Sequence, residues 1–220
     1  MPIHMYREIE SLKKKILSLS ALVEESFQGA VKCIDSHNDE LAKSVITADP
    51  IIDEMEVEVE EDCLKLLALY QPVAVDLRYI IASLKINNDL ERIGDLTVNI
   101  AEETIALSRI PHVDPPPELL TMAGKVQEMV RKSLDCLIDL DEGLAAQICA
   151  DDDEVDALHR QILNRVQRTD RDSAGILKQM LHYLLIANNL ERIADHATNI
   201  AEDTIYMIEG DIVRHRLQES

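Results

Sequence analysis

Oxygen-bearing side chains recur on one side of a helix-forming segment in the second quarter of the chain. On a helix drawn at about 100° per residue they fall within roughly 80° of one another, and they are Asn88, Glu91, Asp95, Asn99 and Glu102. Leu90, Ile93 and Ile100 lie on the opposite side. The same five residue types return at positions 188, 191, 195, 199 and 202. Carboxylate and amide oxygens are ligands for hard or borderline cations, so this spacing indicates metal binding.

A solvated charged face is the commoner explanation of such a stripe, but two observations favour metal ligands. Positions that are merely solvated are free to change identity, yet the five polar types are kept in both copies while positions 97 and 98 differ. Glu91 and Asp95 are like charges at i and i+4, which costs an isolated helix about 0.2–0.5 kcal/mol. A cation bound between them would reverse the sign of that interaction.

A second acidic run lies between residues 49 and 62, which hold eight carboxylates and no Lys or Arg. Four of its residues share one helical face, and they are Asp49, Asp53, Glu56 and Glu60. The equivalents in the second copy are Asp152, Asp156, His159 and Leu163. Apolar residues flank this face, so we expect it to meet a neighbouring helix. Oxygen ligands such as these suit iron, manganese, magnesium, zinc or calcium.

The elements that must position these residues are long helices. Apolar residues spaced three and four apart predict a helix from Ile9 to the polar stretch at 35–38. We expect a short helix over 39–47, a helix from Pro50 to about Tyr70 with Asp49 as its N-cap, and another from Pro72 to about Arg109. The proline cluster at 111–117 cannot lie inside a helix and predicts a linker.

The chain contains an internal repeat. A shift of 103 residues aligns Cys33 with Cys136 and Asp53 with Asp156, and a shift of 100 makes twelve of the 18 positions in 88–105 identical to those in 188–205. The sequence therefore predicts an all-α protein built as a tandem, pseudo-symmetric pair of three-helix bundles. We expect repeats over 1–110 and 118–215, joined by the Pro-rich linker 111–117.

Composition excludes several classes of protein. Lys and Arg total 22 against 42 Asp and Glu, so the net charge of −20 disfavours binding to nucleic acid or docking on anionic lipid. Six Gly and seven Pro in 220 residues are too few for the turns of an all-β fold. Four cysteines without a Cys-x-x-Cys spacing suggest a reducing compartment. With no signal-peptide core and no long apolar run, we expect a soluble cytoplasmic protein.

Familiar catalytic motifs are missing from the sequence. None of the histidines that can be tested has a Glu three residues before it, as a ferritin-like di-iron site requires, and there is no Gly-rich phosphate loop and no Gly-x-Ser-x-Gly. His159 is a candidate metal ligand. His182 and His196 lie off the ligand face and are expected to be packing or surface residues, and Arg78 is expected to form an intramolecular ion pair.

The two copies of the acidic motif resemble the paired signature of the PhoU family of phosphate-uptake regulators. The resembling segments are Leu-Glu-Arg-Ile-Gly-Asp-Leu-Thr-Val-Asn-Ile-Ala-Glu from Leu90, Leu-Glu-Arg-Ile-Ala-Asp-His-Ala-Thr-Asn-Ile-Ala-Glu from Leu190, and Gln-Pro-Val-Ala-Val-Asp-Leu-Arg from Gln71. The resemblance spans essentially the whole chain. It implies multinuclear clusters of divalent or trivalent ions, such as iron, zinc, manganese or magnesium, on the surfaces of the bundles.

Carried over residue by residue, the resemblance implies two metal sites. The first contains Glu91, Asp95 and Asp53 from the facing helix, and the second contains Glu191, Asp195 and Asp156. Leu163 departs from the acidic pattern at the position of Glu60, which puts equal metal occupancy in question. The resemblance also implies negative regulation of phosphate uptake and of phosphate-starvation signalling. The implied partners are the ATPase of a phosphate ABC transporter and a sensor histidine kinase, with a homodimer as the assembly and contact with the membrane only through partners.

Three functional hypotheses remain open on the sequence. The leading one is a non-catalytic, metal-binding adaptor. The second is a phosphohydrolase with a carboxylate-bridged pair of metal ions that activates water. The third is a purely structural helical scaffold whose acidic faces only confer solubility. Metal analysis separates the third hypothesis from the others, and a phosphoester turnover assay separates the second from the first.

Overall fold

Six long helices make up the chain in a computed structural model that describes residues 3–36, 38–111, 113–169 and 174–209. They are α1 (Ile3–Ser36), α2 (Asp39–Tyr70), α3 (Ala74–Ser108), α4 (Pro117–Asp139), α5 (Glu142–Arg168) and α6 (Ala174–Glu209). The described part of the chain contains no β-strand. The predicted all-α fold class is therefore confirmed.

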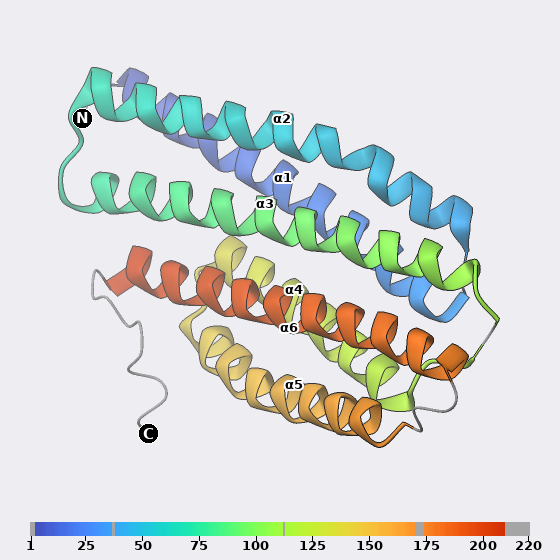
Figure 1. Cartoon of the computed structure of the whole chain (residues 1–220). Helices are drawn as coiled ribbons and strands as arrows, with labels where there is room; N and C mark the ends of the chain where they lie inside the picture. Colours follow the sequence, from blue (N-terminus) through green and yellow to red (C-terminus); the bar gives the residue numbers. More distant parts are fainter. Residues whose placement is uncertain (1–2, 37, 112, 170–173, 210–220) are drawn as a thin grey trace.

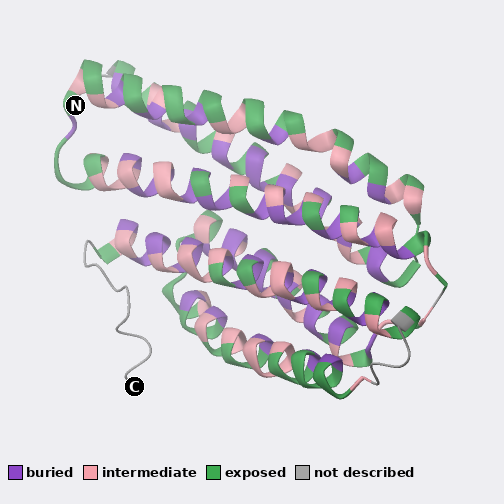
Figure 2. Cartoon of the chain, viewed as in Figure 1, coloured by how far each residue is buried: buried purple, intermediate pink, exposed green. Residues whose placement is uncertain are grey.

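The helices form two three-helix bundles that lie side by side (Figure 1), α1–α3 in one and α4–α6 in the other. The most extensive contact between helices joins α3 to α6, and α1 also contacts α4. The buried side chains line the inner faces of the helices (Figure 2). Leu90, Ile93 and Ile100, predicted to face the core, have no exposed surface. The tandem pair of bundles predicted from the repeat is confirmed.

The predicted break between a short and a long helix at Asp49–Pro50 is wrong. The structure has one continuous helix, α2, with Pro50 inside it. Asn38, not Asp49, is the N-cap, and its side-chain oxygen accepts hydrogen bonds from the backbone N–H groups of Glu40 and Leu41. A proline inside a helix removes one backbone hydrogen bond and costs about 3 kcal/mol. Pro50 is exposed, so water can reach the carbonyl that it leaves unpaired, and packing of α2 on α1 and α3 offsets the cost.

The second repeat is built in the same way, because α5 is also one continuous helix. The proline cluster does separate the bundles, although its last residue, Pro117, already begins α4. A proline fits there because the first N–H of a helix has no intrahelical partner. The domain boundaries at 1–110, 111–117 and 118–215 stay a prediction, and residues 112 and 210–215 lie outside the described part.

Polar side chains join the two bundles across the contact between α3 and α6. His196 Nδ1 lies 2.7 Å from Asp89 Oδ1, and Lys85 Nζ donates to Asp203 Oδ1 at 2.9 Å. His182 Nδ1 lies 2.6 Å from an oxygen of Glu103. Both histidines therefore have carboxylate partners in the first repeat, a role that the sequence analysis did not assign to them.

Among the described helices, none combines the length and apolarity needed to cross a membrane.

Candidate functional site

Carboxylates of α2 and α3 come together along one side of the first bundle. We call this group the first acidic site, and it comprises Asp49, Asp53, Glu56, Glu91 and Asp95. Burial raises the pKa of Glu91, and the negative charges of Asp95, Glu56 and Asp53 raise it further. Burial likewise raises the pKa of Asp49, with contributions from Asp53 and Asp95. The three residues predicted for this site, one from α2 and two from α3, therefore lie close enough to interact electrostatically.

Gly94 lets α2 approach α3 closely at the first acidic site. A Cβ atom on Gly94 would lie 3.3 Å from Ile52 Cγ2 and 3.5 Å from Asp49 Oδ1. Asp49 Oδ1 and Glu91 Oε2 are both buried and have no hydrogen-bond partner among the described residues. Such buried acceptors are costly unless a donor or cation approaches them.

Arg92 pairs with the two α3 carboxylates of the first acidic site. Its Nη1 donates to Asp95 Oδ2 at 3.2 Å, and its Nε forms an ion pair with Glu91 Oε2 at 3.4 Å. The Arg92 side chain is about half exposed, at 49% of its maximum, so solvent screens these pairs and they are weak. A bound metal ion would therefore displace a weak competitor.

The second repeat brings the equivalent residues together between α5 and α6. We call this group the second acidic site, and it comprises Asp152, Asp156, His159, Glu191 and Asp195. Burial raises the pKa of Asp152 to about 6, with the charges of Asp195, Asp156, Asp153 and Glu191 acting in the same direction. Burial and the charges of Asp195 and Asp156 raise the pKa of Glu191. The three predicted residues of this site are thus also brought together.

The two acidic sites differ at one equivalent position, which is Glu56 in the first site and His159 in the second, and the two side chains contact different asparagines. In the first, Asn87 Nδ2 donates to both the side-chain Oε1 and the backbone oxygen of Glu56, each at 3.0 Å. In the second, His159 takes the place of Glu56, and its Nε2 lies 2.7 Å from Asn188 Oδ1. In a neutral ring, a proton on Nε2 that is donated to this amide oxygen would leave Nδ1 with the lone pair that a metal ion needs. Nitrogen ligands suit borderline ions such as zinc and iron.

The donor chemistry of both acidic sites fits a metal ion, but the side chains do not stand ready to hold one. Within the described residues, no three His, Cys, Asp or Glu side chains are grouped so that they could hold an ion as they stand. Like charges repel one another in the absence of a cation, so ligation requires side-chain rotation. Two features of the first site favour such a step, namely its two buried oxygens that accept no hydrogen bond from the described residues and the exposure of Asp53. Metal binding through Asp53, Glu91, Asp95, Asp156, Glu191 and Asp195 stays a prediction.

Some residues near the sites were not singled out by the sequence. Asp49 and Asp152 stood in the acidic runs but not in the predicted ligand sets, although the structure places both among the carboxylates of their sites. The sequence signal that could have included them is their position on the same helical face as the predicted ligands Asp53 and Asp156. The Nε of Arg78 is buried without a hydrogen-bond partner in the described part of the chain, so the ion pair expected for it is not found at that atom.

Tandem three-helix bundles, each with carboxylates from its second and third helices facing one another, define a duplicated α-helical protein with paired acidic sites. The PhoU domain matches residues 16–104 and again residues 119–204. The chain therefore belongs to the PhoU family.

Relatives and solved structures agree with this assignment over nearly the full length. The Phosphate-specific transport system accessory protein PhoU homolog of Aquifex aeolicus is 39% identical over 212 residues, covering 96% of each chain. That of Clostridium acetobutylicum is 34% identical over 204 residues, covering 92% of this chain and 93% of the relative. The crystal structure of PhoU from Pseudomonas aeruginosa superposes with a TM-score of 0.90 at 32% identity, covering 94% of this chain and 99% of that one.

Proposed function

We propose that this chain is a non-catalytic accessory regulator of a phosphate-specific transport system. In this role it lowers phosphate uptake and phosphate-starvation signalling when phosphate is plentiful. The observation that carries the proposal is membership of the PhoU family through both repeats, with relatives that are named as accessory proteins of phosphate-specific transport.

The proposed mode of action is that of an adaptor. The chain would contact the ATPase of a phosphate ABC transporter and a sensor histidine kinase, reaching the membrane through these partners from the cytoplasmic side, and it would act as a homodimer. Paired bundles suit such a role because each presents long exposed helical faces (Figure 2).

Metal binding at the two acidic sites is part of the proposal. In the first acidic site, Asp53 with Glu91 and Asp95 would hold the ion, and in the second, Asp156 with Glu191 and Asp195. A bound ion would supply positive charge between helices that otherwise face each other with like charges, and so fix α2 against α3 and α5 against α6. Support comes from the raised pKa of Glu91 and Glu191, which reflects burial and crowded negative charge at both positions.

The regulatory role is tested by complementation. The chain is expressed in a bacterium that lacks its own PhoU protein, and phosphate uptake and a starvation-gene reporter are measured in phosphate-rich medium. We expect the chain to restore repression, whereas full derepression at normal protein levels would overturn the proposal. The same preparation, purified without chelator, is analysed for metal and assayed on phosphoesters with added manganese, where measurable turnover would favour the phosphohydrolase.

A further inference from the structure

The second half of α5 is basic in a chain that is otherwise strongly acidic. From position 157 to position 169 there is no Asp or Glu, and the stretch contains Arg160, Arg165 and Arg168. The matching part of α2 has the opposite sign, since it carries six carboxylates against a single lysine, Lys65, and these are Glu54, Glu56, Glu58, Glu60, Glu61 and Asp62. The two repeats therefore share a fold here but not a surface charge.

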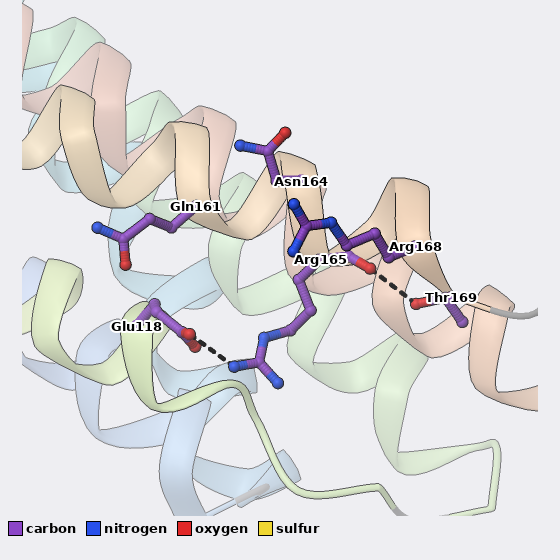
Figure 3. Close-up of a pocket in the computed structure, with 6 residues that line it drawn as sticks. All are labelled: Glu118, Gln161, Asn164, Arg165, Arg168 and Thr169. Atoms are coloured by element: carbon purple, nitrogen blue, oxygen red, sulfur yellow. Dashed lines mark hydrogen bonds and ion pairs between the residues drawn. The ribbon is translucent and has the colours of Figure 1, made fainter.

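The basic end of α5 borders a polar cleft of about 550 Å³ against the first turn of α4. Its lining residues are Glu118, Gln161, Asn164, Arg165, Arg168 and Thr169. Figure 3 shows the Arg165 side chain reaching across to Glu118, and Arg165 Nη2 donates to Glu118 Oε1 at 2.6 Å. Arg168 is exposed and makes no ion pair with any residue that the structure describes.

Several polar groups of the cleft have capacity for a further partner. The second carboxylate oxygen of Glu118, Oε2, is buried and has no hydrogen-bond partner in the described part of the chain. Because this oxygen has almost no exposed surface, a donor reaches it only after the Glu118 side chain moves. The guanidinium of Arg168 can pair with a carboxylate in a bidentate manner, and the amides of Gln161 and Asn164 can both donate to and accept from a peptide backbone.

We propose that this cleft binds an acidic, Asp- or Glu-rich peptide segment of a partner protein. The chemistry of the cleft favours a polypeptide because the amide side chains of Gln161 and Asn164 line the same cleft as the two arginines. A net charge of −20 repels an extended anionic surface such as a membrane or a nucleic acid. At physiological salt, charges more than about 8 Å apart are largely screened from one another. A short peptide in the cleft would therefore interact mainly with the arginines that line it. This proposal goes beyond the regulatory function above, since peptide binding can be measured whether or not the chain controls phosphate uptake.

A simpler role for these arginines is to stabilise the C-terminal end of α5 through the helix dipole. That role predicts no binding of an acidic peptide, so a binding measurement separates the two explanations. The probe is a fluorescein-labelled peptide of eight glutamates, followed by fluorescence anisotropy with the full chain at about 0.15 M salt, where the repulsion by the net charge of the chain is screened. An octaglutamine peptide, inorganic phosphate and phosphatidylglycerol vesicles serve as comparison ligands.

We expect the octaglutamate peptide to bind the wild-type chain and to bind R165Q/R168Q about 10-fold or more weakly, because charged hydrogen bonds are lost. The matched control is R131Q, which removes an exposed arginine from α4 away from the cleft and should change affinity less than twofold. If the double variant melts differently from wild type, R168Q alone replaces it, since Arg168 has no ion pair in the described part of the chain. Equal affinity in the cleft variants and the control, or binding of phosphate or vesicles without binding of the peptide, would overturn the proposal.

Discussion

Asp152 is the carboxylate of the second acidic site whose pKa is raised to a value near the working pH. Burial and four neighbouring negative charges raise it from 3.8 to about 6. The folded state thus holds this proton more tightly than the unfolded state. The stabilisation from the protonated group is fully present below about pH 4 and is lost as the pH rises through about 6. At pH 7 the ionised carboxylate destabilises the fold.

Replacing Asp152 by Asn removes this unfavourable charge while keeping the shape of the side chain. A pKa change of this size corresponds to about 3 kcal/mol at most. Because Asp152 is only partly buried, solvent screening reduces the expected gain to about 1–1.5 kcal/mol. For a chain of this length we expect the melting temperature of D152N at pH 7 with chelator to rise by about 2–5 °C.

The measurement is thermal unfolding followed by circular dichroism at pH 7 and at pH 4. The gain of D152N over wild type should shrink toward zero at pH 4, because there the wild-type carboxyl is protonated in the folded state. Glu61, which is exposed on α2 and is not among the charges that raise the pKa of Asp152, provides the control, and E61Q should change the melting temperature by less than about 1 °C. A D152N gain that is absent at pH 7, or that persists unchanged at pH 4, would refute the assignment of a crowded negative site.

Three further predictions concern the metal, the proline and the linker. The double variant E91Q/D95N should bind about half the metal of wild type by elemental analysis if the second site loads independently, and unchanged metal content would mean that the first acidic site is misplaced. P50A should raise the melting temperature by about 2–4 °C, because it restores one backbone hydrogen bond inside α2 that is worth about 1 kcal/mol, and a lower value would show that α2 depends on the proline. Tyr183 donates from its hydroxyl to the Val113 carbonyl at 2.7 Å, so Y183F should cost about 1 kcal/mol in denaturant unfolding, whereas no change would mean that this bond does not hold the linker.

The fold was predictable because apolar periodicity and the internal repeat are local properties of the sequence. Leu90, Ile93 and Ile100 lie at spacings that can face only one side of a helix, and all three are fully buried. Pro50 was misjudged because an Asp-Pro pair has the same local signature whether a helix begins there or continues through it. What decides between the two is packing of α2 against α1 and α3, which no short window of sequence contains.

The way in which the two bundles pack against each other could not be predicted from the sequence. His196 and Asp89 are 107 residues apart, and their 2.7 Å contact depends on how α3 lies against α6. The helical wheel placed His196 correctly off the ligand face but gave it no partner. The acidic residues were easier to assign, since neighbouring helices in a three-helix bundle must face one another. Even so, the wheel could not distinguish Asp53, which is exposed, from Asp49, which has a buried oxygen.

Comparison of the two repeats separates what the fold requires from what a partner or ligand requires. Core positions keep their chemistry, as with Ile93 and Ile193, both fully buried. Glu56 and His159, by contrast, occupy equivalent places and differ in both charge and ligand type. Because either residue is compatible with the same bundle, packing cannot explain the difference. The two acidic sites have therefore diverged in charge and in the type of side chain they present, and the basic end of α5 shows that surface charge has diverged between the repeats as well.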